Sequence, residues 1–465
     1  MRFSQIFLTM GYNTVVKVDK VTEIKSTESG NTMDAEYIGA FKRFDRIPKE
    51  IWSARVCTFF AGFRYTEEKK MITIARCLSE DYIHSSKLKN FCSSHGMTVS
   101  ENKPELLRQI IEFAGEDESS EKYVETYDWL LEAIKEGSKE FCLKRVYVPE
   151  ESIENLEQII SSKYDSCPRS DILSFKSKET ASLVDYQIEN DEQGIASKIS
   201  FVFSTMVLEG DQENERGNRI IYPIYIDLYI NEGFFVGRYK PKTTIYKCSE
   251  NDIVYKENRF KPLDETGKLI ESLGKILKTE NMDINPSQKF GKMMYKLYQK
   301  YSFTPADIQS QIDSLKDIKE DFVNNIFKRL NLNILNKKKA KMDLDIFLEK
   351  FISINGDREK VFKEDREAYL IKISSDDIMQ MTRIDTASTG NRPLQCSETF
   401  FDGKKSILNT KECKNLHLCY NRKRGYLGCF TVQFSVTKGW GVIKTYYVPE
   451  EDDIQNVLQT VFENY

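Results

Sequence analysis

Residues 220–239 carry the strongest strand signal: Ile220-Ile-Tyr-Pro-Ile-Tyr-Ile-Asp-Leu-Tyr-Ile230, then Asn231-Glu-Gly233, then Phe234-Phe-Val-Gly-Arg-Tyr239. The two longer segments consist mainly of β-branched and aromatic residues, which favour strands. The short segment between them contains the Asn and Gly that tight turns use. The stretch therefore predicts an antiparallel hairpin. Pro223 suits an edge position or the first residue of a strand, because it cannot donate a backbone hydrogen bond.

Downstream of this hairpin the pattern becomes helical, with apolar residues recurring every three to four positions. Four helices are expected within residues 262–354: Glu265–Thr279, Pro286–Tyr301, Pro305–Leu330 and Met342–Ile354. The basic run Asn336–Lys341 is expected to lie between the last two. Strands then resume, and a helix closes the chain; these segments are Ala368–Ile373, Leu427–Val436, Gly441–Val448 and the helix Asp453–Phe462.

These patterns predict a multidomain α+β fold, with an N-terminal α/β region and a C-terminal mixed β-sheet domain interrupted by a helical insertion. The polar residues 161–195 are expected to form a linker or an exposed loop. The expected segments are an N-terminal mixed region (1–84), a helical hairpin (85–116), a helix–strand–helix unit (117–165), a β-rich segment (171–261), the helical insertion (262–362) and a C-terminal β-rich segment with the closing helix (363–465).

Composition indicates a globular protein with a substantial core, because 40% of the 465 residues are hydrophobic and 30% are charged. The net charge of −4 means that any contact with nucleic acid must come from local basic patches. No apolar run approaches the roughly 20 residues needed to span a bilayer, so no membrane partner is expected. The ten Cys are scattered, which favours reduced thiols and a cytoplasmic location.

A second distinctive stretch reads Leu88-Lys-Asn-Phe91-Cys-Ser-Ser-His95-Gly96-Met97-Thr-Val-Ser100-Glu-Asn-Lys103-Pro-Glu105-Leu106-Leu-Arg-Gln-Ile110. Gly96 allows the positive φ that commonly ends a helix. Ser100 suits an N-cap, and Pro104 with Glu105 suits the first turn of a second helix. The stretch therefore predicts two short helices joined by an extended connection.

This layout, over about residues 85–115, resembles the SAP motif, a helix–extended–helix module that binds duplex DNA. The resemblance implies that the start of the second helix holds phosphates, with DNA contacts from Lys87, Lys89, Ser100, Asn102, Lys103 and Arg108. The family usually has Gly directly after the Ser; this chain has Glu101, whose charge weakens a phosphate site. The alternative is a helical hairpin that serves only packing.

Two further segments are basic and contain aromatic residues, a combination that can neutralise phosphates and stack on bases. The first adds Arg422, Lys423 and Arg424 to the expected DNA contacts, beside Tyr420, Tyr426 and Trp440. The second contains Arg238, Lys240, Lys242 and Lys247. The alternative for both is a solvated charged surface over buried aromatic rings.

The leading hypothesis is therefore a DNA-binding protein that docks on duplex DNA and also has protein partners. A SAP-like module on a large unfamiliar domain suits a bacterial component of genome maintenance or of defence against foreign DNA. A first alternative is a non-catalytic subunit of a protein assembly, with the helices of residues 262–354 as its partner surface. It would bind no DNA.

A second alternative is a metal-dependent nuclease. Asp402 and Glu412-Cys-Lys414 match the bare Asp…Glu-x-Lys spacing of nucleases of the restriction-endonuclease-like superfamily, which bind Mg²⁺ or Mn²⁺. The segment around Glu412 is polar, whereas the Glu-x-Lys of such nucleases lies on a buried strand. Outside this alternative no cofactor is expected, because the sequence contains neither a P-loop nor a Gly-x-Ser-x-Gly elbow. The Cys and His residues near the C-terminus, Cys396, Cys413, His417, Cys419 and Cys429, lack the spacing of common zinc sites.

Overall fold

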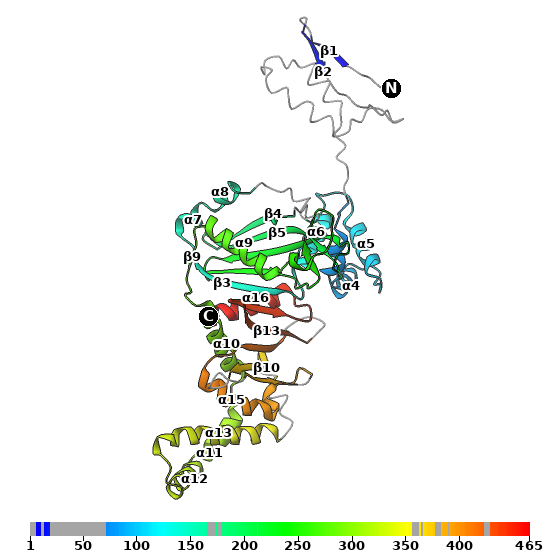
Figure 1. Cartoon of the computed structure of the whole chain (residues 1–465). Coiled ribbons are helices and arrows are strands. Elements are labelled where there is room, and N and C mark those ends of the chain that lie inside the picture. The colour runs from blue at the N-terminus through cyan, green and yellow to red at the C-terminus, as the bar shows by residue number, and fades with distance from the viewer. Residues whose placement is uncertain are drawn as a thin grey trace. The chain divides into compact units, whose positions relative to one another are not determined.

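The computed structural model of the chain describes residues 6–10, 14–18, 71–164, 173, 179–211, 213–355, 362–363, 366–376, 383–388, 390–422 and 428–465 (Figure 1). The chain divides into two compact units, residues 1–71 with 114–124, and residues 72–113 with 125–465. In the first unit, β1 (Ile6–Met10) and β2 (Thr14–Val18) pair as an antiparallel hairpin. The second unit contains the large sheet and the sites described below.

Twelve of the described strands form one sheet, in the order β11-β10-β12-β13-β14-β3-β7-β6-β5-β4, with β8 beside β5 and β9 beside β3. All pairings among these strands are antiparallel. The central β14–β3 pair joins strands from before and after the helical segment 262–354. The strands are β3 (Glu140–Tyr147), β4 (Ser182–Asn190), β5 (Ala196–Glu209), β6 (Asn218–Tyr229), β7 (Phe234–Tyr239), β8 (Ile245–Lys247), β9 (Glu280–Asn281), β10 (Ala368–Asp376), β11 (Arg383–Ala387), β12 (Asn415–Asn421), β13 (Cys429–Thr437) and β14 (Trp440–Thr445).

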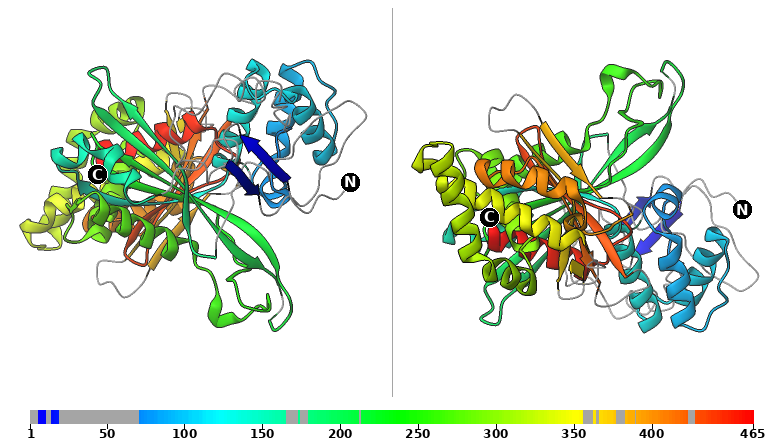
Figure 2. Two further views of the ribbon diagram at one scale, coloured as in Figure 1. Left: turned by 90° about the horizontal axis from the view of Figure 1, so that it is seen from above. Right: turned by 90° about the horizontal axis from the view of Figure 1, so that it is seen from below.

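The hairpin predicted from residues 220–239 is the β6–β7 pair, and Gly233 supplies the positive φ of +73° in its turn. Every residue of β7 is buried, as expected for a central strand covered on both faces. Pro223 pairs with Ser204 of β5, whereas the β6–β7 pairing stops at Ile224. Pro223 therefore lies where β6 has a partner on one side only, which a residue without an N–H tolerates. Figure 2 shows the twist of the sheet and the long β5–β6 ribbon that extends from it.

One face of the sheet is covered by α9 (Pro262–Ile276). Ile270 and Leu273 of α9 share a buried core with Phe201, Phe203 and Phe235 of the strands. The helix lies close to β7, because a Cβ at Gly237 would stand 2.3 Å from Cγ2 of Thr266. Gly237 thus leaves room for α9.

The opposite face carries the second core, under α10 (Pro286–Tyr301), α15 (Glu398–Thr410) and α16 (Glu451–Asn464). Phe290 of α10 and Val457 of α16 pack there with Leu418 and Phe434 of the strands. A Cβ at Gly441 of β14 would stand 2.2 Å from Cδ2 of Phe290, so the ring of Phe290 rests directly on the strand. Part of this face, over β4, β5 and β6, borders a pocket.

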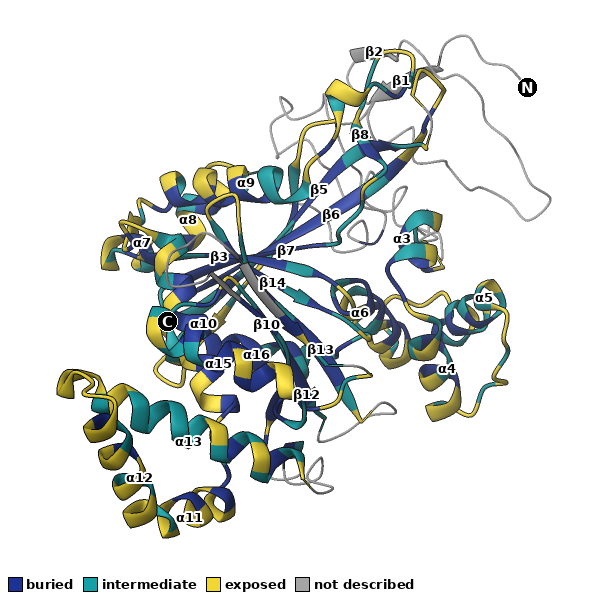
Figure 3. Cartoon of the chain, turned by 60° about the horizontal axis from the view of Figure 1, so that its bottom comes forward, coloured by how far each residue is buried: buried dark blue, intermediate teal, exposed yellow. Residues whose placement is uncertain are grey.

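The remaining helices lie before, between and after the strands. They are α3 (Arg76–Asp81), α4 (Ser85–Ser94), α5 (Lys103–Ala114), α6 (Glu121–Lys135), α7 (Glu150–Glu154), α8 (Leu156–Ser161), α11 (Ala306–Ser314), α12 (Lys316–Arg329) and α13 (Lys337–Ile354). In Figure 3 the strands are mostly buried, α12 is mostly exposed, and α13 is mostly of intermediate burial. The exposed apolar residues on α12, α13 and the turn between them are Ile318, Phe322, Leu330, Leu332, Ile334, Leu335, Phe347 and Phe351.

The α+β class expected from the sequence is confirmed, and its sheet is antiparallel rather than mixed over the described strands. The expectation of a linker is wrong for Ser182–Asn190, which form β4 at the edge of the sheet. The helix expected at Pro305–Leu330 is divided at Leu315 into α11 and α12. The basic run expected between helices instead begins α13, from Lys337 onward.

Candidate functional site

The helical hairpin expected within residues 85–116 consists of α4 and α5. Gly96, with φ +68°, follows α4, and residues 97–102 connect the helices without helix or strand. Phe91 of α4 and Leu106 of α5 are buried, and the ring centroid of Phe91 lies 4.4 Å from that of Trp129 in α6. The hairpin thus has its own apolar core and is anchored on α6.

Two of the expected DNA contacts in this hairpin, the largely covered Lys87 and the partly exposed Lys103, are already bonded to other parts of the chain. Lys87 Nζ lies 2.7 Å from Glu136 Oε2 and 3.4 Å from Glu450 Oε1. Burial lowers the pKa of Lys87, but these two carboxylates outweigh it and leave the pKa above its ordinary value. Lys103 Nζ donates to the carbonyl oxygen of Glu80 at 2.6 Å. Both ammonium groups would have to leave internal partners to reach a phosphate.

The other expected contacts in the hairpin remain at the surface. Lys89 Nζ lies 2.6 Å from Glu101 Oε2, so the acid that replaces the family's Gly neutralises this Lys. Arg108 is half-exposed and is bonded to Glu105 and Glu112 on its own helix. Ser100 Oγ accepts a hydrogen bond from the backbone N–H of Asn102 at 3.0 Å, in the turn that leads into α5.

The described part of the C-terminal basic segment is internal. Arg422 donates from Nη2 to the carbonyl oxygens of Tyr447 and Val448, both at 2.9 Å, and its Nε lies 3.2 Å from Asp453 Oδ2. Tyr420 is buried, and Trp440 packs against α9 beside Gly267. Arg422 therefore links the end of β12 to the start of α16 and to the residues just before it. Lys423 and Arg424 lie outside the described residues.

The residues of the nuclease alternative do not gather around one point. Asp402 lies within α15, eight residues and roughly 12 Å of helix before the last residue of that helix, Thr410. Asp402 is paired with Lys350, at 3.3 Å, whereas Glu412 accepts a hydrogen bond from Gln288 of α10, at 3.4 Å. Lys414 precedes β12, and its backbone N–H donates to Ser374. The two carboxylates thus have separate partners on different elements.

Among the described residues, no group of three or more His, Cys, Asp or Glu side chains is placed to hold a metal ion. Cys413 and Cys419 are buried free thiols, and burial raises the pKa of both. Such thiols behave as small apolar residues of a core.

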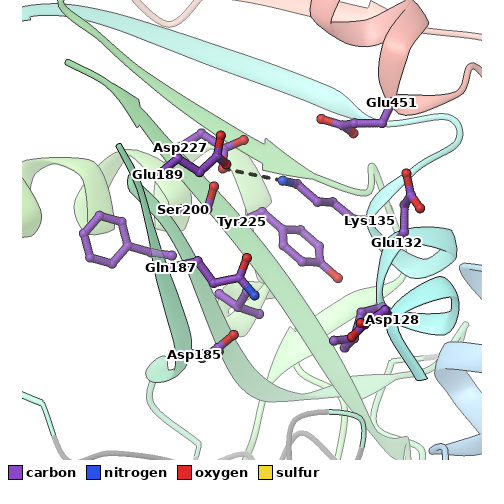
Figure 4. Close-up of a pocket in the computed structure, with 13 residues that line it drawn as sticks. Asp128, Glu132, Lys135, Asp185, Gln187, Glu189, Ser200, Tyr225, Asp227 and Glu451 are labelled. Carbon is purple, nitrogen blue, oxygen red and sulfur yellow. Dashed lines mark ion pairs between the residues drawn. The ribbon is translucent and has the colours of Figure 1, made fainter. Parts of the chain in front are cut away.

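A pocket of about 520 Å³ lies on the sheet face opposite α9, bounded by β4, β5, β6, α6 and the start of α16 (Figure 4). Alternate residues of a strand share one face, so polar side chains of the three strands form its floor. These are Asp185, Gln187 and Glu189 of β4, Ser200 of β5, and Tyr225 and Asp227 of β6. Helical spacing places Asp128, Glu132 and Lys135 of α6 along one wall, and Glu451, the first residue of α16, lies at the edge.

The floor contains a buried network of charges. Asp227 and Arg238 are almost completely buried, with 1% and 0% of their side chains exposed. Arg238 donates two hydrogen bonds to the carboxylate of Glu451, from Nη1 at 2.5 Å and from Nη2 at 2.9 Å. Ser200 of β5 lies beside Asp227 and helps to lower its pKa, and the nearest cations are Lys135 Nζ at 3.6 Å and Arg238 Nη2 at 3.8 Å. These distances exceed those of direct hydrogen bonds.

Both carboxylates of this network are ionised at neutral pH. Burial acts to raise the pKa of Asp227, but Lys135 and Arg238 outweigh it, and the pKa falls below its ordinary value. Burial likewise acts to raise the pKa of Glu451, and Arg238 outweighs it by a wide margin. The carboxylates of Asp227 and Glu451 are therefore both negatively charged, and they lie beside the cations Lys135 and Arg238.

The sequence analysis missed this pocket, although local signals for parts of it exist. Polar residues alternate along β4 at Asp185, Gln187 and Glu189, the pattern of a strand with one polar face. Arg238, expected in a basic surface patch, follows Phe234 and Val236 at every second position and so shares their inward face. What the sequence does not indicate is that these segments meet at α6 and α16.

No protein-family model matches this chain, and no curated protein matches it. None of the described helices is long and apolar enough to span a bilayer. The interpretation of both sites therefore depends on their own geometry.

Proposed function

We propose that the chain is a cytoplasmic protein that docks on duplex DNA through the α4–α5 hairpin. The observation that carries the proposal is the start of α5: Ser100 and Asn102 form the turn that leads into this helix, Lys89 pairs with Glu101 of the same turn, and Arg108 lies further along the helix. Helix N-termini attract phosphate because their N–H groups are unsatisfied and the helix dipole is positive there. Such docking would serve genome maintenance or defence against foreign DNA.

The ion pairs of Lys89 and Arg108 are compatible with docking. Glu101 is 92% exposed and Arg108 is 56% exposed, whereas the side chain of Lys89 is 29% exposed. Solvent screens ion pairs at the protein surface, so these cations can turn to phosphates at little cost. Lys87 and Lys103, which are held by internal partners, are not part of the proposed contact set.

Glu101 supplies a test in which binding should become stronger. Glu101→Gln removes the partner of Lys89 and a negative charge from the proposed DNA surface, so affinity for a short duplex should rise several-fold. Arg108→Glu should lower it by at least tenfold. Fluorescence anisotropy with a labelled duplex at low salt measures both effects.

Lys268→Glu is the matched control, because Lys268 is also an exposed helical cation, 2.8 Å from Glu265, but lies on α9. It should leave affinity unchanged. The proposal fails if Arg108→Glu and Lys268→Glu have equal effects, or if Glu101→Gln weakens binding.

A further inference from the structure

Another pocket, of about 260 Å³, lies beside the start of β3 and the end of β7. Its lining includes Lys139, which directly precedes β3, Lys240, which directly follows β7, and Lys103 at the start of α5. The β3–β7 register pairs Glu140 with Tyr239, so its continuation places Lys139 opposite Lys240. Like charges directly opposite each other on neighbouring strands are destabilising. Two ammonium groups in this position therefore call for a counter-charge.

The three lysines of this pocket form no ion pair with a carboxylate of the described residues. Each donates to a backbone carbonyl oxygen instead: Lys103 to that of Glu80, at 2.6 Å, Lys139 to that of Glu136, and Lys240 to that of Asp81. The carboxylates of the same three acids, which also line the pocket, are paired with other cations: Glu80 with Arg76, Asp81 with Lys242, and Glu136 with Lys87. The acids of the lining thus bind cations other than these three lysines.

Carboxylates in the neighbourhood do not restore the ordinary pKa of the three lysines. Burial lowers the pKa of Lys139 well below its usual range, and Lys240 and Arg238 lower it further, against two weaker carboxylate effects. Burial likewise lowers the pKa of Lys240, and Lys103 adds to that effect, whereas Asp81 opposes it. The pKa of Lys103 is also lowered by burial. A nearby anion would favour the charged form of all three groups.

Tyr82 supplies a separate indication that the lining is incomplete. This residue lines the pocket and is 6% exposed, and its hydroxyl has no hydrogen-bond partner among the described residues. Lys139 Nζ and Lys240 Nζ lie 5.2 and 4.9 Å from the centre of its ring. A buried hydroxyl without a partner costs free energy, which a ligand with oxygen acceptors would recover.

From this arrangement we infer that the pocket binds the phosphate group of a small molecule, held by the ammonium groups of Lys103, Lys139 and Lys240. A phosphate monoester carries between one and two negative charges at neutral pH and several acceptor oxygens, so it can serve three donors at once. Each ammonium has three N–H groups and can bind the phosphate while keeping its carbonyl partner.

The position of Lys139 favours a small molecule over duplex DNA as the source of the phosphate. Only 2% of Lys139 is exposed, so its ammonium is reached from within the pocket rather than from the protein surface. Lys139 and Lys240 also lie outside the α4–α5 hairpin. The inferred site therefore does not depend on the proposed DNA docking.

Isothermal titration calorimetry of the full chain with inorganic phosphate at low ionic strength tests the inference. The wild-type protein should bind phosphate at one site, and sodium acetate at the same ionic strength should give no comparable binding. Lys240→Met should weaken phosphate binding at least tenfold, whereas Lys268→Met, at an exposed cation of α9, should leave it unchanged. Lys240→Met should leave duplex affinity unchanged, and Arg108→Glu should leave phosphate affinity unchanged.

Glu80→Gln separates loss of the site from loss of folding. It removes a negative charge from the lining but keeps the backbone carbonyl that Lys103 binds, so phosphate should bind several-fold more tightly, a result that misfolding cannot produce. Absence of phosphate binding, equal affinities in Lys240→Met and Lys268→Met, or unchanged or weaker binding in Glu80→Gln would each overturn the inference. Loss of duplex binding in Lys240→Met would overturn the assignment to a small molecule.

Discussion

Replacing Arg238 with Met should strongly destabilise the second unit, because this one buried guanidinium serves two carboxylates. Arg238 is bonded twice to Glu451 and lies 3.8 Å from Asp227, and none of its side chain is exposed. Removing one partner of a buried ion pair typically costs about 3–5 kcal/mol, since the remaining charge is left uncompensated. We expect a loss of that size at neutral pH, while Lys268→Met, at an exposed pair, should cost under about 1 kcal/mol.

The loss should depend on pH in a defined direction. In the wild type, Arg238 holds the pKa of Glu451 well below its ordinary value, so this carboxylate adds stability above about pH 4.5 that is lost as pH falls through the lower folded-state pKa. In the variant, burial remains and raises that pKa. The carboxylate then destabilises the fold at neutral pH, and protonation relieves it. The difference between the two proteins should therefore shrink as pH falls.

Urea denaturation at neutral pH and at about pH 4.5 measures both effects, because urea, unlike guanidinium chloride, leaves charges unscreened. The double variant Arg238→Met/Glu451→Gln should lose less than the sum of the single losses, since the two residues interact directly. A loss below about 1 kcal/mol for Arg238→Met, or an equal loss at both pH values, would refute this description of the network.

Three further changes test other parts of the structure. Gly441→Ala should cost about 1–3 kcal/mol, because its Cβ would stand 2.2 Å from the buried ring of Phe290; an unchanged melting temperature would contradict the packing of α10. Burial, with Lys372 nearby, lowers the pKa of His417 to about 4, so stability should fall by about 1–2 kcal/mol from pH 6.5 to pH 4 as the unfolded chain takes up the proton. His417→Gln should flatten that slope in urea denaturation, and equal slopes would argue against a buried neutral imidazole. Glu450→Ala should cost about 1 kcal/mol in thermal unfolding by removing the capping box of α16, and no loss would show that the cap is unimportant.

Local sequence patterns predicted the individual helices and strands better than they predicted which strands pair with one another. The β6–β7 hairpin and the helices α9 and α10 follow from strand composition and helical periodicity within short windows. The β14–β3 pair joins Gly441 with Leu143, and no local pattern specifies a partner about 300 residues away. The interruption at Leu315 was also missed, because helical periodicity continues through it.

The sites show the same limit. The layout of α4 and α5 is visible in the sequence, but the inward turn of Lys87 depends on Glu136 and Glu450, which come from other segments. Arg238 looked like a surface cation because only the folded chain brings Glu451 to it. Whether a charged residue lies at the surface or in a buried ion pair depends on its partner. For Lys87 and Arg238 that partner is distant in the sequence, so only the tertiary structure shows it.

The salt dependence of duplex binding tests the central claim, DNA docking by the α4–α5 hairpin, most directly. If Lys89, Arg108 and the start of α5 neutralise two to four phosphates, log K should fall against log salt concentration with a slope of about −2 to −4. Arg108→Ala should make that slope shallower by about one. No binding at low salt, or a slope unchanged by Arg108→Ala, would contradict docking through this hairpin.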